Sequence, residues 1–294
     1  MADSKTVSLT DPQFIGKLDA LYLLAQSILK GNLQADRRTE RKGSGIDFAD
    51  YAEYQLGDDY RAIDWKIYAR IEQLLVKLFE VEEDTTVYIM LDASPSMKTK
   101  YSLAKQIAAS LGYIALNSLD RLASYCFTDK LEHIMTPSRG RGKTLPFLRT
   151  LDTSVCSGND TRFTQCCKAL QARHRKKGIV VVLSDFLFAQ GFDEGLAILQ
   201  GAGHDVHCIQ VHDPKDLSCD WVGDANLFCQ ETGQQEKVTV TEVEAAAYNK
   251  AMQEWNESLR AYCKRKGIGL TAITTKDSFE LVIQGLLRKG GLVA

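Results

Sequence analysis

Two short apolar runs stand out in the pattern of hydrophobic and polar positions along the chain. They cover residues 86–92 and 179–183, and they consist almost entirely of β-branched, aromatic and aliphatic residues. Runs of this length and composition predict strands that are buried on both faces, as in the centre of a parallel sheet. An aspartate lies at the end of each run, Asp92 and Asp185, so we expect both carboxylates at one edge of that sheet.

Helical and strand patterns alternate from residue 86 to the end of the chain. Apolar residues at helical spacing predict helices at about 101–119, 144–151, 164–175, 192–202, 242–266 and 278–288. Further strands are predicted at about 121–128, 132–136, 204–212 and 268–274. This alternation predicts an α/β fold with a doubly wound, mostly parallel sheet. Two strand-like runs at about 219–240 interrupt it and predict an inserted β-hairpin.

The first 82 residues lack the regular alternation of helical and strand patterns seen in the rest of the chain. A helix is predicted at about 13–31, and a charged, glycine-bearing stretch follows it. Residues 74–83 then alternate apolar and polar positions, which is typical of a strand. We therefore expect two parts. Residues 1–82 form a helix and an irregular α+β segment packed on the rest, and residues 83–294 form the main domain.

Composition and charge narrow the class of protein. The 294 residues are 45% hydrophobic and 25% charged, with a net charge of −2, as in ordinary globular proteins. This charge gives no electrostatic case for a nucleic-acid partner. The eight cysteines contain no Cys-x-x-Cys pair, so neither a zinc site nor a disulfide framework is predicted. Without a signal peptide or an apolar stretch near 18 residues, we expect no membrane span and a cytoplasmic location.

The motif Asp92-x-Ser94-x-Ser96 ends the first apolar run. A carboxylate with two hydroxyls is a hard oxygen set, which suits Mg²⁺ or Mn²⁺ better than Zn²⁺. Each hydroxyl alone would be read as a helix cap or a turn residue. Because Asp185 ends a second buried strand, the combination favours a metal site instead.

A threonine is expected to supply the third oxygen. Thr161 and Thr164 both lie in the segment that leads into a predicted helix. The spacing to the apolar pair at residues 169–170 favours Thr164, and Thr161 is the alternative.

These residues resemble the metal-ion-dependent adhesion site (MIDAS) of von Willebrand factor A (vWA) domains. In that family a doubly wound parallel sheet usually carries Mg²⁺, and an acidic residue of a partner protein completes the coordination. The resemblance implies that hydroxyls corresponding to Ser94, Ser96 and Thr164 bind the ion directly. It also implies that Asp92 and Asp185 act largely through water. The implied function is metal-mediated protein binding.

The chain as a whole, over about residues 15–293, is similar to the domain-of-unknown-function family 58 (DUF58). Its hallmarks here are the N-terminal motifs Gly43-x-Gly45-x-x-Phe48, Tyr54-x-x-Gly-Asp-Asp-x-Arg-x-Ile-Asp-Trp65, Ala69-Arg70 and Leu75-Val76-Lys77, of which the first is specific. The motif residues that we expect to be structural are Gly57, Asp58, Asp59, Arg61, Asp64, Trp65 and Arg70. Such proteins are similar to partners of MoxR-type AAA+ ATPases, which implies a role in assembling or activating other proteins.

The three aspartates among these motif residues do not predict catalysis, because no histidine or nucleophile accompanies them. We expect them to accept backbone hydrogen bonds in a turn and to pair with Arg61 or Arg70. Trp65 is expected to pack in a core. The five histidines are scattered and form no recognisable catalytic order with a serine or cysteine.

The leading hypothesis from sequence is a non-enzymatic interaction protein that depends on Mg²⁺ or Mn²⁺. A Mg²⁺-dependent phosphoesterase that uses Asp92 is the enzymatic alternative. Ser94 argues against it, because phosphatases of the haloacid-dehalogenase type carry a second aspartate at that position. A scaffold whose metal site has decayed is the third hypothesis.

Overall fold

The computed structural model describes residues 8–33, 40–42, 47–80, 85–158, 160–228 and 235–288. The chain divides into two compact units. The smaller unit is Ser27–Asp84, and the larger one contains the described residues before and after it. Helix α1 (Pro12–Leu33) begins in the larger unit, which includes it up to Gln26.

A six-stranded sheet forms the centre of the larger unit, in the order β11-β8-β7-β4-β5-β6. Its strands are β4 (Thr86–Asp92), β5 (Arg121–Phe127), β6 (Leu131–Arg139), β7 (Ile179–Ser184), β8 (Asp205–His212) and β11 (Gly269–Thr274). All neighbours run parallel except β5 and β6, which are antiparallel. The predicted mixed α/β fold with a mostly parallel central sheet is therefore confirmed.

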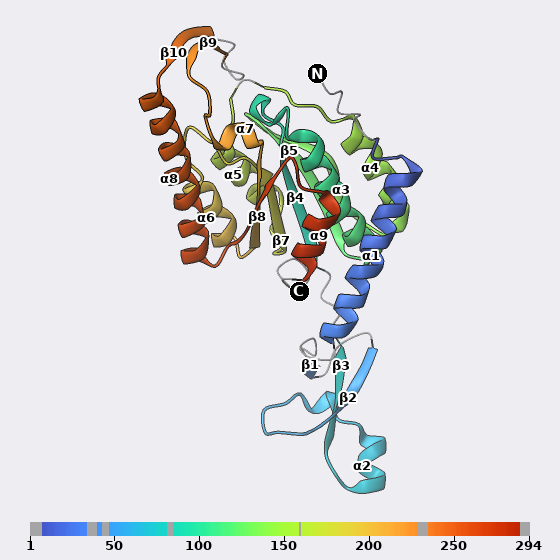
Figure 1. Cartoon of the computed structure of the whole chain (residues 1–294). Helices are drawn as coiled ribbons and strands as arrows, with labels where there is room; N and C mark the ends of the chain where they lie inside the picture. Colours follow the sequence, from blue (N-terminus) through green and yellow to red (C-terminus); the bar gives the residue numbers. More distant parts are fainter. Residues whose placement is uncertain are drawn as a thin grey trace. The chain divides into compact units, whose positions relative to one another are not determined.

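Helices lie on both sides of this sheet (Figure 1). One side carries the start of α1 together with α3 (Tyr101–Asn117), α4 (Thr144–Thr153) and α9 (Phe279–Arg288). The other side carries α5 (Phe163–Arg173), α6 (Asp193–Gly201) and α8 (Glu242–Lys266). Because both faces are covered, the central strands need apolar residues on both faces. All seven residues of β4 and all six of β7 are buried.

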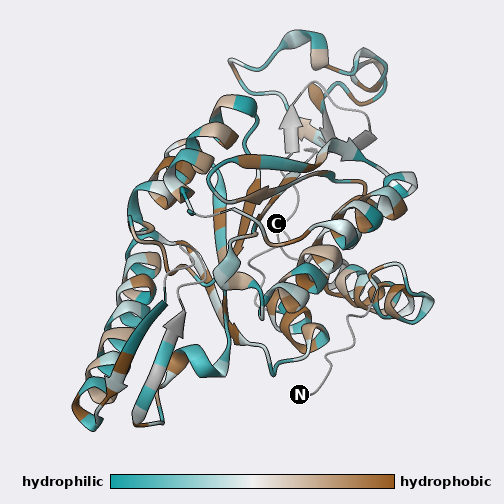
Figure 2. Ribbon diagram, turned by 90° about the horizontal axis from the view of Figure 1, so that it is seen from above, coloured by the Kyte–Doolittle hydropathy of each residue, from teal (hydrophilic) through white to brown (hydrophobic). Residues whose placement is uncertain are grey.

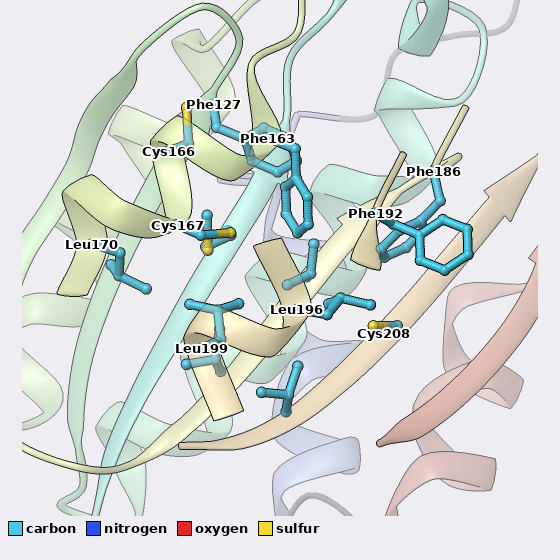
Figure 3. Close-up of a cluster of buried hydrophobic side chains, with 14 of the residues drawn as sticks. Phe127, Phe163, Cys166, Cys167, Leu170, Phe186, Phe192, Leu196, Leu199 and Cys208 are labelled. Carbon is cyan, nitrogen blue, oxygen red and sulfur yellow. The ribbon is translucent and has the colours of Figure 1, made fainter. Parts of the chain in front are cut away.

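The core under α5 and α6 is rich in aromatic and sulfur-containing side chains (Figure 3). The ring of Phe163 lies 6.3 Å from that of Phe186, centroid to centroid, and both side chains are buried. Apolar residues concentrate on the strands and on the helix faces that meet them (Figure 2). This packing fixes the loop after β7, where Phe186 lies.

A two-stranded antiparallel sheet follows β8 in the chain. It consists of β9 (Gly223–Phe228) and β10 (Gln235–Val240), after the short helix α7 (Pro214–Leu217). The sequence-predicted hairpin is therefore present. Helix α8 then begins with a capping box formed by Thr241 and Glu244, and it ends at Gly267 with φ of 68°. This left-handed conformation is the one expected for a glycine that caps a helix.

The smaller unit contains a three-stranded antiparallel sheet in the order β1-β3-β2. Its elements are β1 (Glu40–Lys42), β2 (Asp47–Glu53), the 3₁₀ turn η1 (Tyr60–Ala62), α2 (Trp65–Ile71) and β3 (Leu75–Glu80). The sequence predicts only the last of these strands. The smaller unit begins at Ser27, since the first part of α1 belongs to the larger unit. Gly43 and Gly45 of the first motif lie outside the described residues.

The aspartates of the DUF58 motif hold turns and a helix start. Asp58 and Asp59 accept backbone N–H groups from Gln55 and Arg61. Asp64 caps α2 by accepting the N–H groups of residues 66 and 67. These contacts confirm that the three carboxylates accept backbone hydrogen bonds in turns.

Two details of the sequence interpretation are wrong. Asp64 forms an ion pair with Lys77 at 3.1 Å, where the sequence led us to expect an arginine partner. Lys77 and the backbone bonds lower the pKa of Asp64. Trp65 is 59% exposed and lies against the ring of Tyr68, so it is not a core anchor. A tryptophan at the first position of a short helix can point away from the sheet, which sequence alone does not show.

Among the described residues, no helix combines the length and the apolar character needed to cross a bilayer.

Close packing of α3 against α4 predicts an asymmetry between two helical glycines. A Cβ added at Gly112 in α3 would lie 2.3 Å from Phe147 Cε1 in α4, whereas one added at Gly285 in α9 meets no described atom within 4 Å. We expect Gly112→Ala to destabilise the protein by about 1–3 kcal/mol and Gly285→Ala to be neutral or mildly stabilising. Denaturant unfolding of both variants measures this difference. Equal midpoints would contradict the packing described here.

Candidate functional site

Four polar side chains lie at or just after the ends of β4 and β7: Asp92, Ser94, Ser96 and Asp185. We call them, together with Thr161 from the segment before α5, the strand-end site. The two strands are parallel neighbours in register, with Leu91 opposite Leu183. Their carboxyl ends therefore meet at one edge of the sheet, as the two apolar runs predict.

Asp92 is the last residue of β4 and has no exposed surface. One carboxylate oxygen accepts the Ser94 backbone N–H at 2.9 Å, and the other accepts the Ser184 hydroxyl at 2.6 Å. Burial and the nearby charge of Asp185 raise the pKa of Asp92 to about 7. The site therefore holds a carboxylate that is costly to ionise unless a positive charge lies nearby.

Ser94 and Ser96 stand at the start of a 3₁₀ turn, η2 (Pro95–Met97), directly after the strand. Ser94 is buried, and its hydroxyl oxygen lies 3.0 Å from that of Ser96. Proline at the first position of the turn fixes the backbone there. The two hydroxyls are thus held side by side next to the Asp92 carboxylate.

Asp185 follows β7 and is buried, and its carboxylate is held by two donors. Oδ1 accepts the Leu187 backbone N–H at 3.1 Å, and Oδ2 accepts the Lys100 ammonium at 2.7 Å. The next residue, Phe186, has φ of 59°, which is unfavourable for a side chain of this size. The Trp255 indole N–H, which donates to the Phe186 carbonyl at 3.1 Å, helps hold this turn in place.

Lys100 is a functional candidate that the sequence does not reveal. Its side chain is 2% exposed, and its ammonium also donates to Asp216 Oδ2 at 2.8 Å. Burial alone would lower the pKa of Lys100, but the two carboxylates outweigh it and hold the pKa above its ordinary value. Nothing in the sequence distinguishes this lysine from Lys98, two positions earlier, which is exposed in the structure.

Two further polar residues support the back of the site. The Gln210 side-chain amide donates to the Asp185 carbonyl at 3.4 Å and to Asn256 Oδ1 at 2.9 Å. His212, at the end of β8, is buried, and burial lowers its pKa. Both residues lie in β8, so periodicity alone assigns them no special role.

Thr161 and Thr164 differ sharply in environment. Thr161 is buried, and its hydroxyl has no hydrogen-bond partner among the described residues. Thr164 lies in the first turn of α5 and is half-buried. The Arg162 backbone N–H donates to the Thr128 carbonyl at 2.9 Å, which ties the Thr161 segment to the loop after β5. Of the two candidates, Thr161 is therefore the one whose hydroxyl is buried and left without a partner by the described residues.

The residues present suit a hard divalent cation. They offer two carboxylates and three hydroxyls. One of these hydroxyls, that of Thr161, is buried and has no hydrogen-bond partner among the described residues. No group of three or more His, Cys, Asp or Glu side chains in the described ranges could hold a metal ion. A cation here would consequently depend on serine and threonine oxygens, which is a set typical of Mg²⁺ or Mn²⁺ and not of Zn²⁺.

The fold and this strand-end site define a mixed α/β protein with a mostly parallel sheet and an oxygen-rich site at one sheet edge. The chain belongs to the family described as "Protein of unknown function DUF58", whose model matches residues 50–261. The match spans the motif at residues 54–65 of the smaller unit and most of the larger unit.

The relatives found for the chain are uncharacterised proteins. The chain is 27% identical over 231 residues to the uncharacterised protein Rv1480 of Mycobacterium tuberculosis, covering 76% of this chain and 73% of that protein. It is also 32% identical over 107 residues to the uncharacterised protein MAV169 of Mycobacterium avium, covering 35% and 63%.

Two solved structures are similar at a lower level. BatB from Bacteroides thetaiotaomicron has a TM-score of 0.44 at 14% identity, over 70% of this chain and 98% of that one. Proximal thread matrix protein 1 from the mussel byssus, with a zinc-occupied MIDAS motif, has a TM-score of 0.41 at 12% identity, over 70% and 46%. We draw no functional conclusion from similarities at this level.

The buried Asp92 predicts a pH dependence of stability when a chelator is present. Its folded-state pKa is about 7, whereas an aspartate in an unfolded chain titrates near about 4. Between these values the folded state keeps a proton that the unfolded state has lost, so rising pH favours unfolding. We expect the wild type to lose stability relative to Asp92→Asn from about pH 4 to about pH 7, by on the order of a few kcal/mol.

Urea unfolding of both proteins across this range measures the effect. The matched control is Asp205→Asn, at an exposed position in β8. A wild type that gains stability relative to Asp92→Asn as pH rises would contradict the assignment.

Proposed function

We propose that this protein is a non-enzymatic interaction module of the von Willebrand A type, whose strand-end site binds Mg²⁺ or Mn²⁺. Through that cation it would capture a carboxylate of a partner protein. The observation that supports this most strongly is the pair of buried carboxylates, Asp92 and Asp185, next to the Ser94 and Ser96 hydroxyls at the ends of neighbouring strands. The Thr161 hydroxyl is one of several buried polar atoms without a partner among the described residues, and it is therefore available to a ligand.

Each residue of the site has a distinct task in this proposal. The hydroxyls of Ser94, Ser96 and Thr161 would supply neutral oxygens that hold the ion. The carboxylates of Asp92 and Asp185 would supply negative charge and hydrogen-bond its waters. When bound, the cation supplies a Lewis-acidic centre that accepts an oxygen from outside the protein. With few formal charges on the site, a partner's carboxylate adds a large share of the attraction.

The partner is proposed from the family resemblance. Membership of DUF58 supports a MoxR-type AAA+ ATPase as the partner, and a role in the assembly or activation of other proteins. A client protein that bears an acidic residue would satisfy the same chemistry.

Two alternatives carry less support. A phosphoesterase would need Asp92 as a nucleophile or as a direct metal ligand with room for substrate. That carboxylate is fully buried and already accepts two hydrogen bonds, so its surroundings weigh against attack on a substrate. A protein whose metal site had decayed would be expected to lack one of the residues that carry the oxygen ligands, but all five residues of the strand-end site are present.

Replacing each of the two threonines by valine tests which hydroxyl binds the cation. We expect Thr161→Val to weaken Mn²⁺ binding by about 10-fold or more, because it removes an oxygen but keeps the side-chain shape. Thr164→Val is the matched control and should bind as the wild type does. Titration with Mn²⁺ followed by electron paramagnetic resonance, with acetate present to complete the coordination, gives both affinities. The reverse order of effects would restore Thr164 as the ligand.

Partner capture tests the function itself. We expect a tagged wild type to retain a MoxR-type ATPase or another partner in Mg²⁺ and to release it when a chelator is added. Asp92→Ala should capture nothing, while Asp205→Ala should capture as the wild type does. Thermal unfolding checks that the variants remain folded. Capture that is unaffected by the chelator and by Asp92→Ala would refute cation-dependent binding.

A further inference from the structure

Lys100 occupies an unusual place beside the strand-end site. A lysine is rarely buried, because its ammonium loses water and its long side chain loses rotamer freedom. Here the side chain is 2% exposed, and the ammonium lies 2.7 Å from Asp185 Oδ2. A second carboxylate, that of Asp216, lies 2.8 Å from the same nitrogen and is 35% exposed. The lysine therefore links one fully buried carboxylate to one near the surface.

The formal charges around Lys100 explain why it is needed. Asp92 and Asp185 are both buried, and their charges interact closely enough to raise the pKa of Asp92. Within the described part of the chain, the Lys100 ammonium is the buried positive charge that contacts Asp185 of this pair. A neighbouring lysine in α3, Lys105, is also buried, but its ammonium donates only to the backbone carbonyls of Asp152 and Ser154 in the described contacts.

Lys100 also connects the site to the elements that precede and follow the β9–β10 hairpin. Asp216 belongs to α7, and its backbone carbonyl accepts the Tyr248 hydroxyl from α8 at 2.9 Å. The side chain of Asn249, also in α8, bonds both the N–H and the carbonyl of Cys219, the second residue after α7. A chain of direct contacts thus runs from Asp185 through Lys100 to α7 and α8.

We propose that Lys100 is the built-in counter-ion of the strand-end site, which neutralises Asp185 when no metal is bound and links cation occupancy to α7 and α8 through Asp216. This inference rests on the proposed function. A divalent cation near Asp185 repels the ammonium and competes for the same carboxylate. Cation binding therefore weakens the contact between Lys100 and Asp185, and Lys100 stays with Asp216.

Two consequences follow for the whole protein. The fold does not need the cation, because Lys100 supplies the positive charge, so the metal alone stabilises the wild type little. Binding becomes favourable when a partner's carboxylate arrives and adds charge of the opposite sign. Lys100 is thus a positioning residue that makes cation uptake depend on the partner.

Thermal unfolding of the whole chain in chelator and in Mg²⁺ tests this role. Lys100→Met leaves Asp185 buried without its counter-ion, so this variant should unfold at a lower temperature than the wild type in chelator. Mg²⁺ should replace the missing charge, so the Mg²⁺-induced rise in Tm should be several degrees larger than in the wild type. The control, Lys105→Met, should lower Tm equally in both buffers.

The outcomes separate this inference from the proposed function. Mn²⁺ binding to the wild type is measured in the same samples, with acetate present. If the wild type binds Mn²⁺ but Lys100→Met shows no larger Mg²⁺ effect, the counter-ion role is overturned and the proposed function stands. If the wild type binds no cation, both fail. If Lys100→Met does not fold in either buffer, the double variant with Asp185→Asn decides. Recovery of folding supports the role, and no recovery overturns it.

Hydrogen exchange tests the link to α7 and α8. In the wild type, Mg²⁺ with an acidic peptide should increase deuterium uptake in residues 214–222, because Lys100 no longer holds α7 to Asp185. Asp216→Ala keeps the ion pair between Lys100 and Asp185 but removes the side-chain tie to α7, so its uptake should not respond. Unchanged uptake in the wild type, at cation concentrations that saturate the site, would overturn the link.

Discussion

Two carboxylates buried at the ends of neighbouring parallel strands are the constraint on which the rest of the site depends. Asp92 and Asp185 lie in the interior, where a charge is costly unless an opposite charge and hydrogen bonds compensate it. The surrounding polar groups serve this need: hydroxyls and backbone N–H groups donate to the carboxylates, and the Lys100 ammonium balances one charge. A divalent cation is a second way to balance the same pair. The proposed function and the proposed role of Lys100 both follow from this electrostatic competition.

The fold makes this arrangement possible because the central strands are buried on both faces. Helices on each side leave the strand ends as the place where a polar group can emerge from the sheet. The aromatic core under α5 and α6 fixes the loop after β7, in which Phe186 takes a left-handed conformation. That turn sets the position of Asp185. The smaller unit carries motif residues that resemble the DUF58 family, and its aspartates shape turns and the start of α2.

Much of the larger unit could be predicted because its elements have strong periodic signals. β4 is predicted to the residue, since a strand buried on both faces must be apolar throughout. The end of α8 is marked by Gly267. In the smaller unit, β2 mixes acidic and aromatic residues and gives no clear pattern. Lys100 could not be recognised, because the burial of a lysine depends on contacts between segments distant in sequence. Spacing favoured Thr164 and left Thr161 as the alternative. The burial of Thr161 and the missing partner of its hydroxyl, which the sequence does not show, favour Thr161.

A crystal structure of the protein grown with Mn²⁺ and an acidic peptide tests the central claim most directly, because anomalous scattering locates the ion. The account predicts a manganese peak among the hydroxyls of Ser94, Ser96 and Thr161, with a peptide carboxylate on the ion. It also predicts that the distance between Lys100 and Asp185 is longer than 2.7 Å. The absence of any peak at the strand ends at saturating Mn²⁺, with the ion pair between Lys100 and Asp185 unchanged, would contradict it.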